Sequence, residues 1–469
     1  MKNPLRPLRF SIRRPWSLAA ILLYVLTANT LINTRNVYER PQNLLRYDQG
    51  GYYSYLPAVW LYGGDFTCSF YDSLGYRSQE FLKDYQGKKF NKYHVGPAVL
   101  LAPFFALGHW EALRSGAPTT GFSPPYLQWA LIGCYFYVAL GLLCLRSLLL
   151  RYFDDVVVAL SLLALALGTN LLYYSTHEAL MSHAYSFFLF ALLWYLAVRY
   201  WESGRLPWLL ATGLVGGLIA ATRLPNLVVG LVVVGWGLSS KADLSERLAH
   251  IGKFWWHFAL ASIPFFLGWL PQLLYFKLVH GSWWIHAYAG ERFFWDQPLV
   301  GRILFSYRKG WLVYTPLMSL ALIGFVPLWR KVRPAFWGIL LFFLVNLYVV
   351  SCWGNWWYGG SYGMRVLIES SAILSFPLAA SISAIVHHRL GSYLFTALFP
   401  LFIGLSLLQT HQYSHGIIHH DAMTKKAYWA VFGHLHPAGK KVMDRREKYL
   451  DRPDYTAANK DREYRGKMR

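Results

Sequence analysis

The chain has 469 residues, of which 55% are hydrophobic and only 14% charged, and its net charge is +22. A soluble protein of this size needs more charged side chains to keep its surface in water, so the composition excludes a soluble globular fold. The lysines and arginines are spread over both tails and short loops, without zinc-ligand spacing or a recognition helix. They favour contact with anionic lipid headgroups over nucleic-acid binding.

The first apolar run, at 16–34, follows a basic N-terminal segment. It is long enough to cross a membrane and no convincing signal-peptide cleavage site follows, so we expect a retained first helix. Ten further runs have spanning length: 126–147, 154–174, 184–200, 207–222, 225–240, 254–276, 311–329, 334–352, 366–386 and 391–408. The segment 95–110 contains prolines and glycine, and could span or lie as a re-entrant or surface helix.

The basic loops select among these topologies, because short cytoplasmic connections collect lysine and arginine. If the N-terminus is cytoplasmic and 95–110 does not span, every predicted inner loop is basic, for example around Arg146, Arg199, Lys241, Arg330 and Arg389. The sequence therefore predicts an all-α polytopic membrane protein with about eleven spans, within a range of about ten to thirteen. The membrane domain covers 1–408. A long first loop, about 35–92, contains juxtamembrane helices and lies outside with a basic tail at 409–469.

The strongest local signal is the segment RYDQGGYYSYLPAVW, which follows the first helix. If 49–56 is helical, Asp48, Tyr52 and Tyr55 share one face, and the two glycines allow close approach of another backbone or of a substrate. A lone carboxylate among tyrosines suits a base that deprotonates an acceptor hydroxyl. The alternative is that Asp48 only caps the helix N-terminus.

A second polar cluster contains His177, Glu178 and His183 in STHEALMSH. The spacing is not that of HExxH zinc proteases. Glu178 and His183 could bind a divalent cation, a phosphate or a sugar hydroxyl, or they could form a polar cap on a helix hairpin.

Arginines at the outer membrane edge form a third set. Arg223, in the turn TRLPN, is flanked by apolar stretches, and a charge at that depth needs a partner such as a phosphate. Arg365 follows a loop rich in tryptophan and glycine, WGNWWYGGSYGMR, whose indoles could stack on a sugar or form an interfacial belt. Glu369, one turn later, could pair with Arg365.

Other motif classes are absent from the sequence. It contains no Walker A motif, no GxGxxG after a strand, no GxSxG and no EF-hand loop, which argues against nucleotide hydrolysis and Rossmann chemistry. The tail histidines after His411 are scattered without ligand spacing, which favours a solvated or loosely docked tail over metal binding. The four cysteines show no CxxC pair and are interpreted as small hydrophobic residues.

These motifs together resemble the GT-C superfamily of polytopic membrane glycosyltransferases, and most closely its bacterial branch labelled glycosyltransferase-39-like or RgtA/B/C/D-like. The resemblance covers the chain to about residue 408. It is carried by five segments: YDQGGYYSYLPA, KYHVGPAVLLAPFF, HEALMSHAYSFFLF, ATRLPNLVV and WYGGSYGMRVLIESSAIL.

The resemblance implies a GT-C-like fold and a polyprenyl-phosphate-linked sugar as donor. It implies that Asp48 acts as general base or holds the acceptor. Several enzymes of the superfamily carry two adjacent acids there, whereas this chain has Asp48-Gln49, and the missing second acid counts against metal dependence. No cofactor is assigned, a divalent cation stays a candidate, and the metal ligands are unknown. Arg223 and Arg365 would bind the donor phosphate. The remaining substrate-binding candidates are Tyr52, Tyr53, Glu178 and His183.

The expected function is sugar transfer to a lipid, glycan or protein acceptor on the extracytoplasmic face of a bacterial plasma membrane. Two alternatives stay open: a transporter or flippase of lipid-linked saccharides, and a non-catalytic assembly factor with a GT-C-like scaffold. Apolar helix centres, with Asn346 among the few exceptions, count against a transport path. The missing second acid supports the assembly factor.

Overall fold

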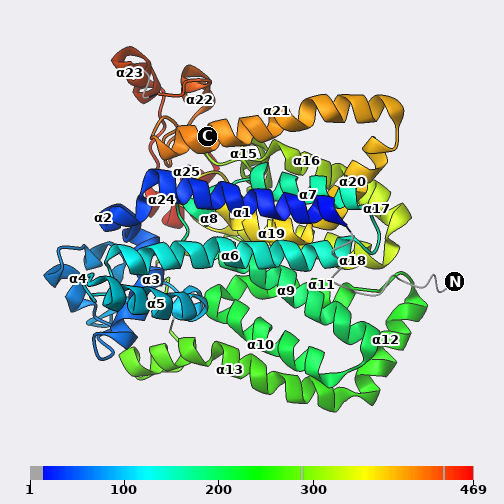
Figure 1. Cartoon of the computed structure of the whole chain (residues 1–469), viewed down its shortest axis with the longest axis horizontal. Coiled ribbons are helices and arrows are strands. Elements are labelled where there is room, and N and C mark those ends of the chain that lie inside the picture. Colours follow the sequence, from blue (N-terminus) through cyan, green and yellow to red (C-terminus); the bar gives the residue numbers. More distant parts are fainter. Residues whose placement is uncertain (1–13, 286, 289, 437–438, 468–469) are drawn as a thin grey trace.

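The computed structural model describes residues 14–285, 287–288, 290–436 and 439–467. Helices dominate this part of the chain (Figure 1), and its one sheet is a two-stranded antiparallel hairpin of β1 (Leu82–Tyr85) and β2 (Lys88–Asn91). The helical membrane-protein class predicted from the sequence is confirmed. Most of the basic N-terminal tail, which we expect in the cytoplasm, lies outside the described residues.

Within the described residues, six helices are long and apolar enough to cross a membrane. They are α1 (Pro15–Arg35, extended by η1, Val37–Glu39), α6 (Pro124–Leu149), α9 (Ser182–Ser203), α13 (Trp255–His280), α18 (Arg333–Cys352) and α21 (Arg389–Ser414). A seventh span would be the pair formed by η5 (Arg365–Leu367) with α19 (Ile368–Ile373), followed by α20 (Ser375–Val386), which is bent by 65°.

The other predicted spans are helical but shorter or interrupted. They contain α7 (Asp155–Leu167) with α8 (Leu171–Thr176), α10 (Leu206–Thr222), η3 (Leu224–Val229) with α11 (Gly230–Gly235), and α15 (Trp311–Tyr314), η4 (Pro316–Met318), α16 (Ser319–Ile323) and α17 (Phe325–Lys331). All eleven apolar runs therefore coincide with helix. Helix length and composition identify only six or seven spans, because prolines and tight turns divide several runs.

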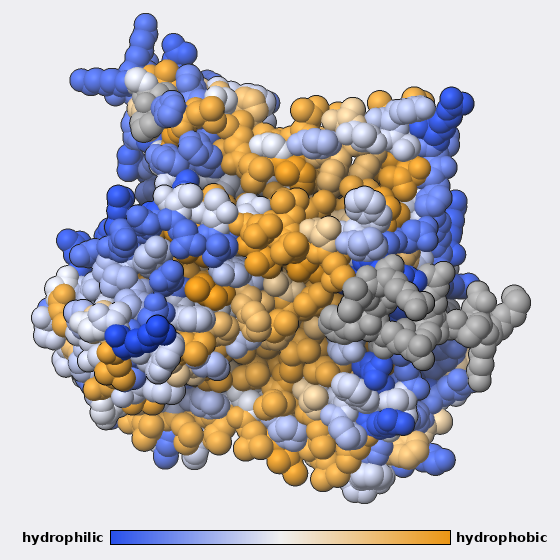
Figure 2. Space-filling model, in the orientation of Figure 1, coloured by the Kyte–Doolittle hydropathy of each residue, from blue (hydrophilic) through white to orange (hydrophobic). Residues whose placement is uncertain are grey.

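An apolar band crosses the surface between two hydrophilic ends (Figure 2). Helices α13 and α21 are the least buried of the six candidates, and side chains such as Phe266 and Leu401 are exposed on them. These helices have the composition and exposure expected of a lipid-facing surface.

The ambiguous segment 95–110 forms α5 (Gly96–Ser115), which is not among the six candidates. Gly96 lies against Thr222 at the end of α10, and Gly108 against the backbone of Tyr126 at the start of α6. Helix α5 lies beside α3 (Tyr47–Trp60) toward one end of the molecule (Figure 1). This placement favours the interpretation in which the segment does not cross the membrane.

The first loop contains the short helices that the sequence predicts: α2 (Pro41–Leu44), α3, α4 (Ser69–Ser73) and η2 (Ser78–Glu80). At the opposite end of the molecule, α12 (Lys241–Lys253) has no buried residue. A further short helix, α14 (Val300–Phe305), follows the long loop after α13.

The C-terminal tail is docked, which contradicts the expectation of a solvated or loosely docked segment. It contains α22 (Lys425–Val431), α23 (Lys440–Lys448), α24 (Tyr455–Lys460) and α25 (Arg462–Lys467). The Arg465 side chain is fully buried and donates hydrogen bonds to the carbonyl oxygens of Ser351, at 2.7 Å, and Trp353, at 3.1 Å. Buried apolar residues such as Met423 and Val431 complete the contact, so hydrophobic and polar interactions both fix the tail.

Candidate active site

A cavity of about 970 Å³ opens among the loops at one end of the helices. Its walls come from α3, the segment before α5, the turn between α8 and α9, the turn after α10, helix α13 and the loop between α18 and η5. The docked tail adds His420, Asp421 and Tyr455. The cavity thus gathers segments that are distant in the sequence.

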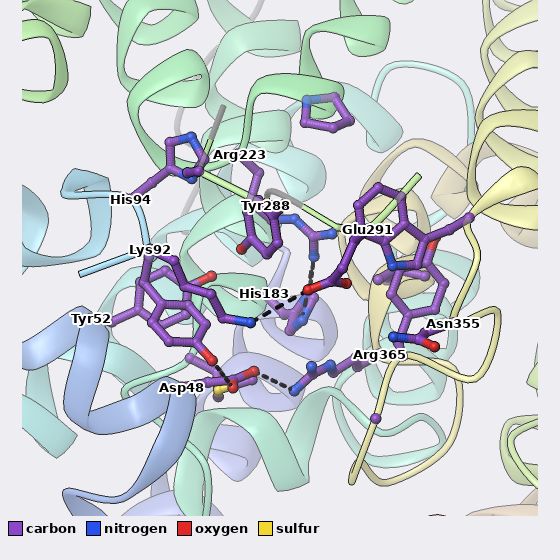
Figure 3. A pocket seen from close by; sticks show the side chains of 18 of the residues that line it. Asp48, Tyr52, Lys92, His94, His183, Arg223, Tyr288, Glu291, Asn355 and Arg365 are labelled. Carbon is purple, nitrogen blue, oxygen red and sulfur yellow. Dashed lines mark hydrogen bonds and ion pairs between the residues drawn. The ribbon is translucent and has the colours of Figure 1, made fainter. Parts of the chain in front are cut away.

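Asp48 lies in the first turn of α3 but does not cap it. Its Oδ2 atom is 2.9 Å from Nη1 of Arg365, and its Oδ1 accepts a hydrogen bond from the Tyr93 hydroxyl (Figure 3). Burial alone would raise the pKa of Asp48, but Arg365 and Tyr93 outweigh burial and hold this pKa below its usual value. Asp48 is therefore an ionised carboxylate at neutral pH, and the capping interpretation is wrong.

The glycines of α3 make this arrangement possible. A Cβ atom on Gly51 would overlap the Tyr93 ring, so the ring packs directly on the helix backbone. The close approach inferred from the sequence is thus made by the protein itself. It brings the Tyr93 hydroxyl to the Asp48 carboxylate.

Glu178 lies in the short turn between α8 and α9 and lines the same cavity. Its Oε1 accepts a hydrogen bond of 3.2 Å from the Tyr173 hydroxyl. Burial raises the pKa of Glu178 to about 7, although the charge of Arg365 opposes that rise. The carboxyl groups of Asp48 and Glu178 therefore differ in their affinity for a proton.

Arg223, His183 and Glu369 form a second cluster, of which Arg223 and His183 line the cavity. Nη1 of Arg223 is 3.0 Å from Nδ1 of His183 and 3.6 Å from Oε1 of Glu369, and His183 Nδ1 is 3.2 Å from Glu369 Oε2. Glu369 therefore pairs with Arg223 and His183. The pairing with Arg365 that the sequence suggested is not formed, because Arg365 turns toward Asp48.

Lys92 and Glu291 are cavity residues that the sequence analysis did not single out. Their side chains form an ion pair of 3.6 Å beside Arg223 (Figure 3). Lys92 lies in the KYHVGP segment that carries the resemblance, which was the available signal. Glu291 lies in an irregular loop with no such pattern. His94 also lines the cavity, and burial followed by the charge of Arg223 lowers its pKa to about 4, so it is neutral.

The predicted aromatic residues divide into two groups. Tyr52 lines the cavity, whereas Tyr53 does not: it is fully buried and its hydroxyl donates a hydrogen bond of 2.6 Å to the Gly121 carbonyl. Tyr53 points away because consecutive helical residues lie about 100° apart around the axis. Trp353 lines the cavity, but Trp356 and Trp357 are fully buried and offer no stacking surface to a sugar.

Among the described residues, one group of three or more side chains could hold a metal ion: His419, His420 and Asp421. Oδ1 of Asp421 is 3.3 Å from Nδ1 of His419 and 3.4 Å from Nε2 of His420, while Oδ2 accepts a hydrogen bond from Tyr455. The backbone N–H groups of Asp421 and Ala422 both donate hydrogen bonds to Nδ1 of His419, so a metal ion at this atom would have to displace them. The histidines are therefore less scattered than the sequence suggested.

Comparison with known proteins gives structural matches only. No family model and no curated protein matches the chain. The apo oligosaccharyltransferase of Archaeoglobus fulgidus is 13% identical, with a TM-score of 0.49, over 97% of this chain and 62% of that chain. Apo ArnT from Cupriavidus metallidurans is 12% identical, also with a TM-score of 0.49, over 88% of this chain and 68% of that chain.

A structure of ArnT bound to undecaprenyl phosphate is 13% identical to the chain, with a TM-score of 0.45, over 94% of this chain and 76% of that one. The chain spans less than two thirds of the length of the oligosaccharyltransferase. With identities of 12–13% and TM-scores below 0.5, these matches establish neither the activity nor the substrate of this chain.

Proposed function

We propose that the chain is a membrane glycosyltransferase of the GT-C type, which moves a sugar from a polyprenyl-phosphate donor to an acceptor hydroxyl. The observation that carries the proposal is a single cavity in which the carboxyl groups of Asp48 and Glu178 face the cations Arg223 and Lys92, next to helix α13. The cavity thus combines carboxyl groups that could contact the acceptor hydroxyl, cations that could bind a phosphate, and an apolar wall that could contact a lipid chain.

The donor lipid would reach the cavity along α13. Trp269 and Phe276 of this helix line the cavity, while Phe266 and Leu267 are exposed on the outer surface. A prenyl chain could therefore lie on an apolar surface with its phosphate in the cavity. Lipid-linked donors suit such a site because the chain stays in the membrane while the sugar enters the polar pocket.

The donor phosphate would bind between Lys92 and Arg223. Both cations are partly exposed to the cavity, and a guanidinium matches the geometry of phosphate oxygens. A phosphate at this position would replace Glu291 as the partner of Lys92. The same cations would stabilise the charge that develops on the phosphate as the sugar leaves. The reaction would take place on the extracytoplasmic side, and the sugar is a hexose or a pentose.

Arg223→Gln should lower the release of polyprenyl phosphate by about 10²–10³-fold, because the developing charge loses its main hydrogen-bond donor. The assay uses the purified protein reconstituted in liposomes with a panel of polyprenyl-phosphate sugars. Arg77→Gln is the control, since Arg77 is an exposed arginine of the first loop outside the cavity.

Undiminished release in Arg223→Gln would contradict the assigned phosphate site. A flippase would move labelled donor across the bilayer without cleaving it. Donor movement without any release of polyprenyl phosphate in the wild type would therefore overturn the glycosyltransferase in favour of the transporter.

A further inference from the structure

Four carboxyl groups of the described residues line the cavity. Glu291 pairs with Lys92 and Asp421 accepts a hydrogen bond from Tyr455, while the other two, Asp48 and Glu178, have unequal partners. Asp48 is engaged on both oxygens, by Arg365 at 2.9 Å and by the Tyr93 hydroxyl. Glu178 accepts one hydrogen bond, from Tyr173 at 3.2 Å, and within the described part of the chain it forms no ion pair. A substrate hydroxyl can therefore approach Glu178 without first displacing a cation.

We propose that Glu178, and not Asp48, accepts the proton of the acceptor hydroxyl, while Asp48 fixes Arg365 and orients the acceptor. The proposal rests on the proposed function and assigns a catalytic duty within it. It revises the expectation from the sequence, which gave that duty to Asp48.

Asp48 is unsuited to receive a proton. Its protonation would abolish the ion pair and leave the Arg365 guanidinium without its counter-charge in a largely buried position. A second cation, Lys92, also favours the ionised form and contributes to the lowered pKa of Asp48. A base whose pKa lies this far below neutral pH accepts a proton from a hydroxyl inefficiently.

Glu178 has the properties of a base that works near neutral pH. Its pKa of about 7 gives both protonation states similar stability, which is the condition for efficient proton transfer. Its backbone N–H donates to the Tyr173 carbonyl at 3.3 Å and its carbonyl accepts from Met181 at 3.0 Å, so the turn is fixed. The charged or titratable groups that influence it are Asp48 of α3, Tyr173 and Tyr174 of α8, Lys309 before α15, Arg365 of η5 and Tyr413 of α21.

The proposed step balances without a further reactant. The acceptor oxygen forms a bond to the anomeric carbon of the sugar. The bond between that carbon and the phosphate oxygen breaks, and its electron pair stays on the phosphate. The hydroxyl proton moves to a carboxylate oxygen of Glu178, which afterwards releases it to water. The products are the glycosylated acceptor and polyprenyl phosphate.

The protonation state of Glu178 can be measured without any activity. Infrared difference spectra of the full chain in liposomes, between about pH 5.5 and pH 8.5, report carboxyl groups that titrate near neutral pH. We expect a protonated-carboxyl band that is lost in Glu178→Gln and kept in Asp48→Asn. A band that persists in Glu178→Gln, or disappears only in Asp48→Asn, would overturn the assignment.

The pH profile of turnover tests the catalytic role. Wild-type turnover should rise about tenfold per pH unit below pH 7 and level off above it, because the active form of Glu178 is deprotonated. Glu178→Gln should lose about 10²–10⁴-fold in turnover and also lose this pH dependence. Tyr173→Phe should move the midpoint to higher pH, because the Tyr173 hydrogen bond favours the ionised form.

The catalytic role would be refuted if turnover of Glu178→Gln still rose with pH below pH 7 as in the wild type. It would also be refuted if the midpoint of that rise were unshifted in Tyr173→Phe. A chain that cleaves no donor at all would disprove the proposed function, whereas the infrared titration would still decide the state of Glu178. The two failures are therefore distinguishable. Thermal melting of each variant shows whether a loss of turnover is a loss of fold.

Discussion

At the residue scale, the ion pair between Asp48 and Arg365 links helix α3 of the first loop to η5. Both side chains are partly exposed to the cavity, at 24% and 15%, so water screens them to some extent. Removing one partner should therefore cost less than the roughly 3–5 kcal/mol typical of fully buried pairs. The pair mainly determines geometry, since it sets the direction of the Arg365 guanidinium.

Gly51→Ala should separate Tyr93 from Asp48, because the added methyl group overlaps the Tyr93 ring. We expect a loss of about 1–3 kcal/mol in stability from overpacking, a lower melting temperature and reduced turnover. Gly252→Ala is the matched control, since Gly252 also lies in a helix, α12, and a Cβ atom added there meets nothing within 4 Å. Equal melting temperatures of the two variants would show that the close contact at Gly51 is not needed.

The sequence predicted which residues line the cavity better than it predicted their partners. Asp48, Glu178 and Arg223 were identified because polar groups at an apolar boundary are costly and need a reason. Their pairing depends on contacts between segments far apart in the chain, so Arg365 was assigned to a phosphate and is found on Asp48. Tyr53 was included by proximity in sequence and points elsewhere.

At the element scale, the docked tail forms part of the cavity wall and is fixed by buried cations. Arg446 donates to the carbonyl oxygens of Gly416 and Ile417, and Arg465 to those of Ser351 and Trp353. Helix α24, which begins with the cavity residue Tyr455, lies immediately before α25 and Arg465. The position of Tyr455 therefore depends on these contacts.

Arg465→Met should release α25, because the Trp353 carbonyl oxygen would lose its donor and the Ser351 carbonyl oxygen would keep only the Leu299 N–H, at a cost of about 1–3 kcal/mol or more. Limited proteolysis should cut the tail faster than in the wild type. Lys467→Met is the control, since Lys467 is 73% exposed and pairs only with Glu463. The same cleavage rate in both variants would mean that Arg465 does not hold the tail.

Apolar runs predicted where helices form, but not where they break. The run at 311–329 is divided into four short elements, with η4 beginning at Pro316 and Gly324 pressed against the Pro377 carbonyl of α20. The bend between α19 and α20 at Leu374 comes just before Pro377, which lies in the first turn of α20 and has no N–H for the Ile373 carbonyl. Prolines and close contacts between helices divide these runs, and hydropathy along one segment records neither.

At the scale of the whole molecule, helix α3, which carries the cavity residue Asp48, and the basic helix α12 lie at opposite ends (Figure 1), and an apolar band crosses the surface between the two ends (Figure 2). Helix α12 carries lysines and an arginine on a connection between long apolar helices, as expected of a cytoplasmic loop. The tail with α23 lies at the cavity end. If the band lies in the bilayer, α12 and α23 must face different compartments.

Single cysteines should therefore react with a membrane-impermeant maleimide from opposite sides. Lys440→Cys, at the start of α23, should be labelled in intact spheroplasts, whereas Lys241→Cys, at the start of α12, should be labelled only after permeabilisation. Both lysines are exposed, while the native Cys68, Cys134 and Cys352 are buried and Cys144 is half-buried, so the labelling of the unmutated protein is the background to subtract. Labelling of both positions from the same side would contradict the placement of the apolar band in the bilayer. The reverse pattern would place the cavity in the cytoplasm, where the donor would have to be cytoplasmic.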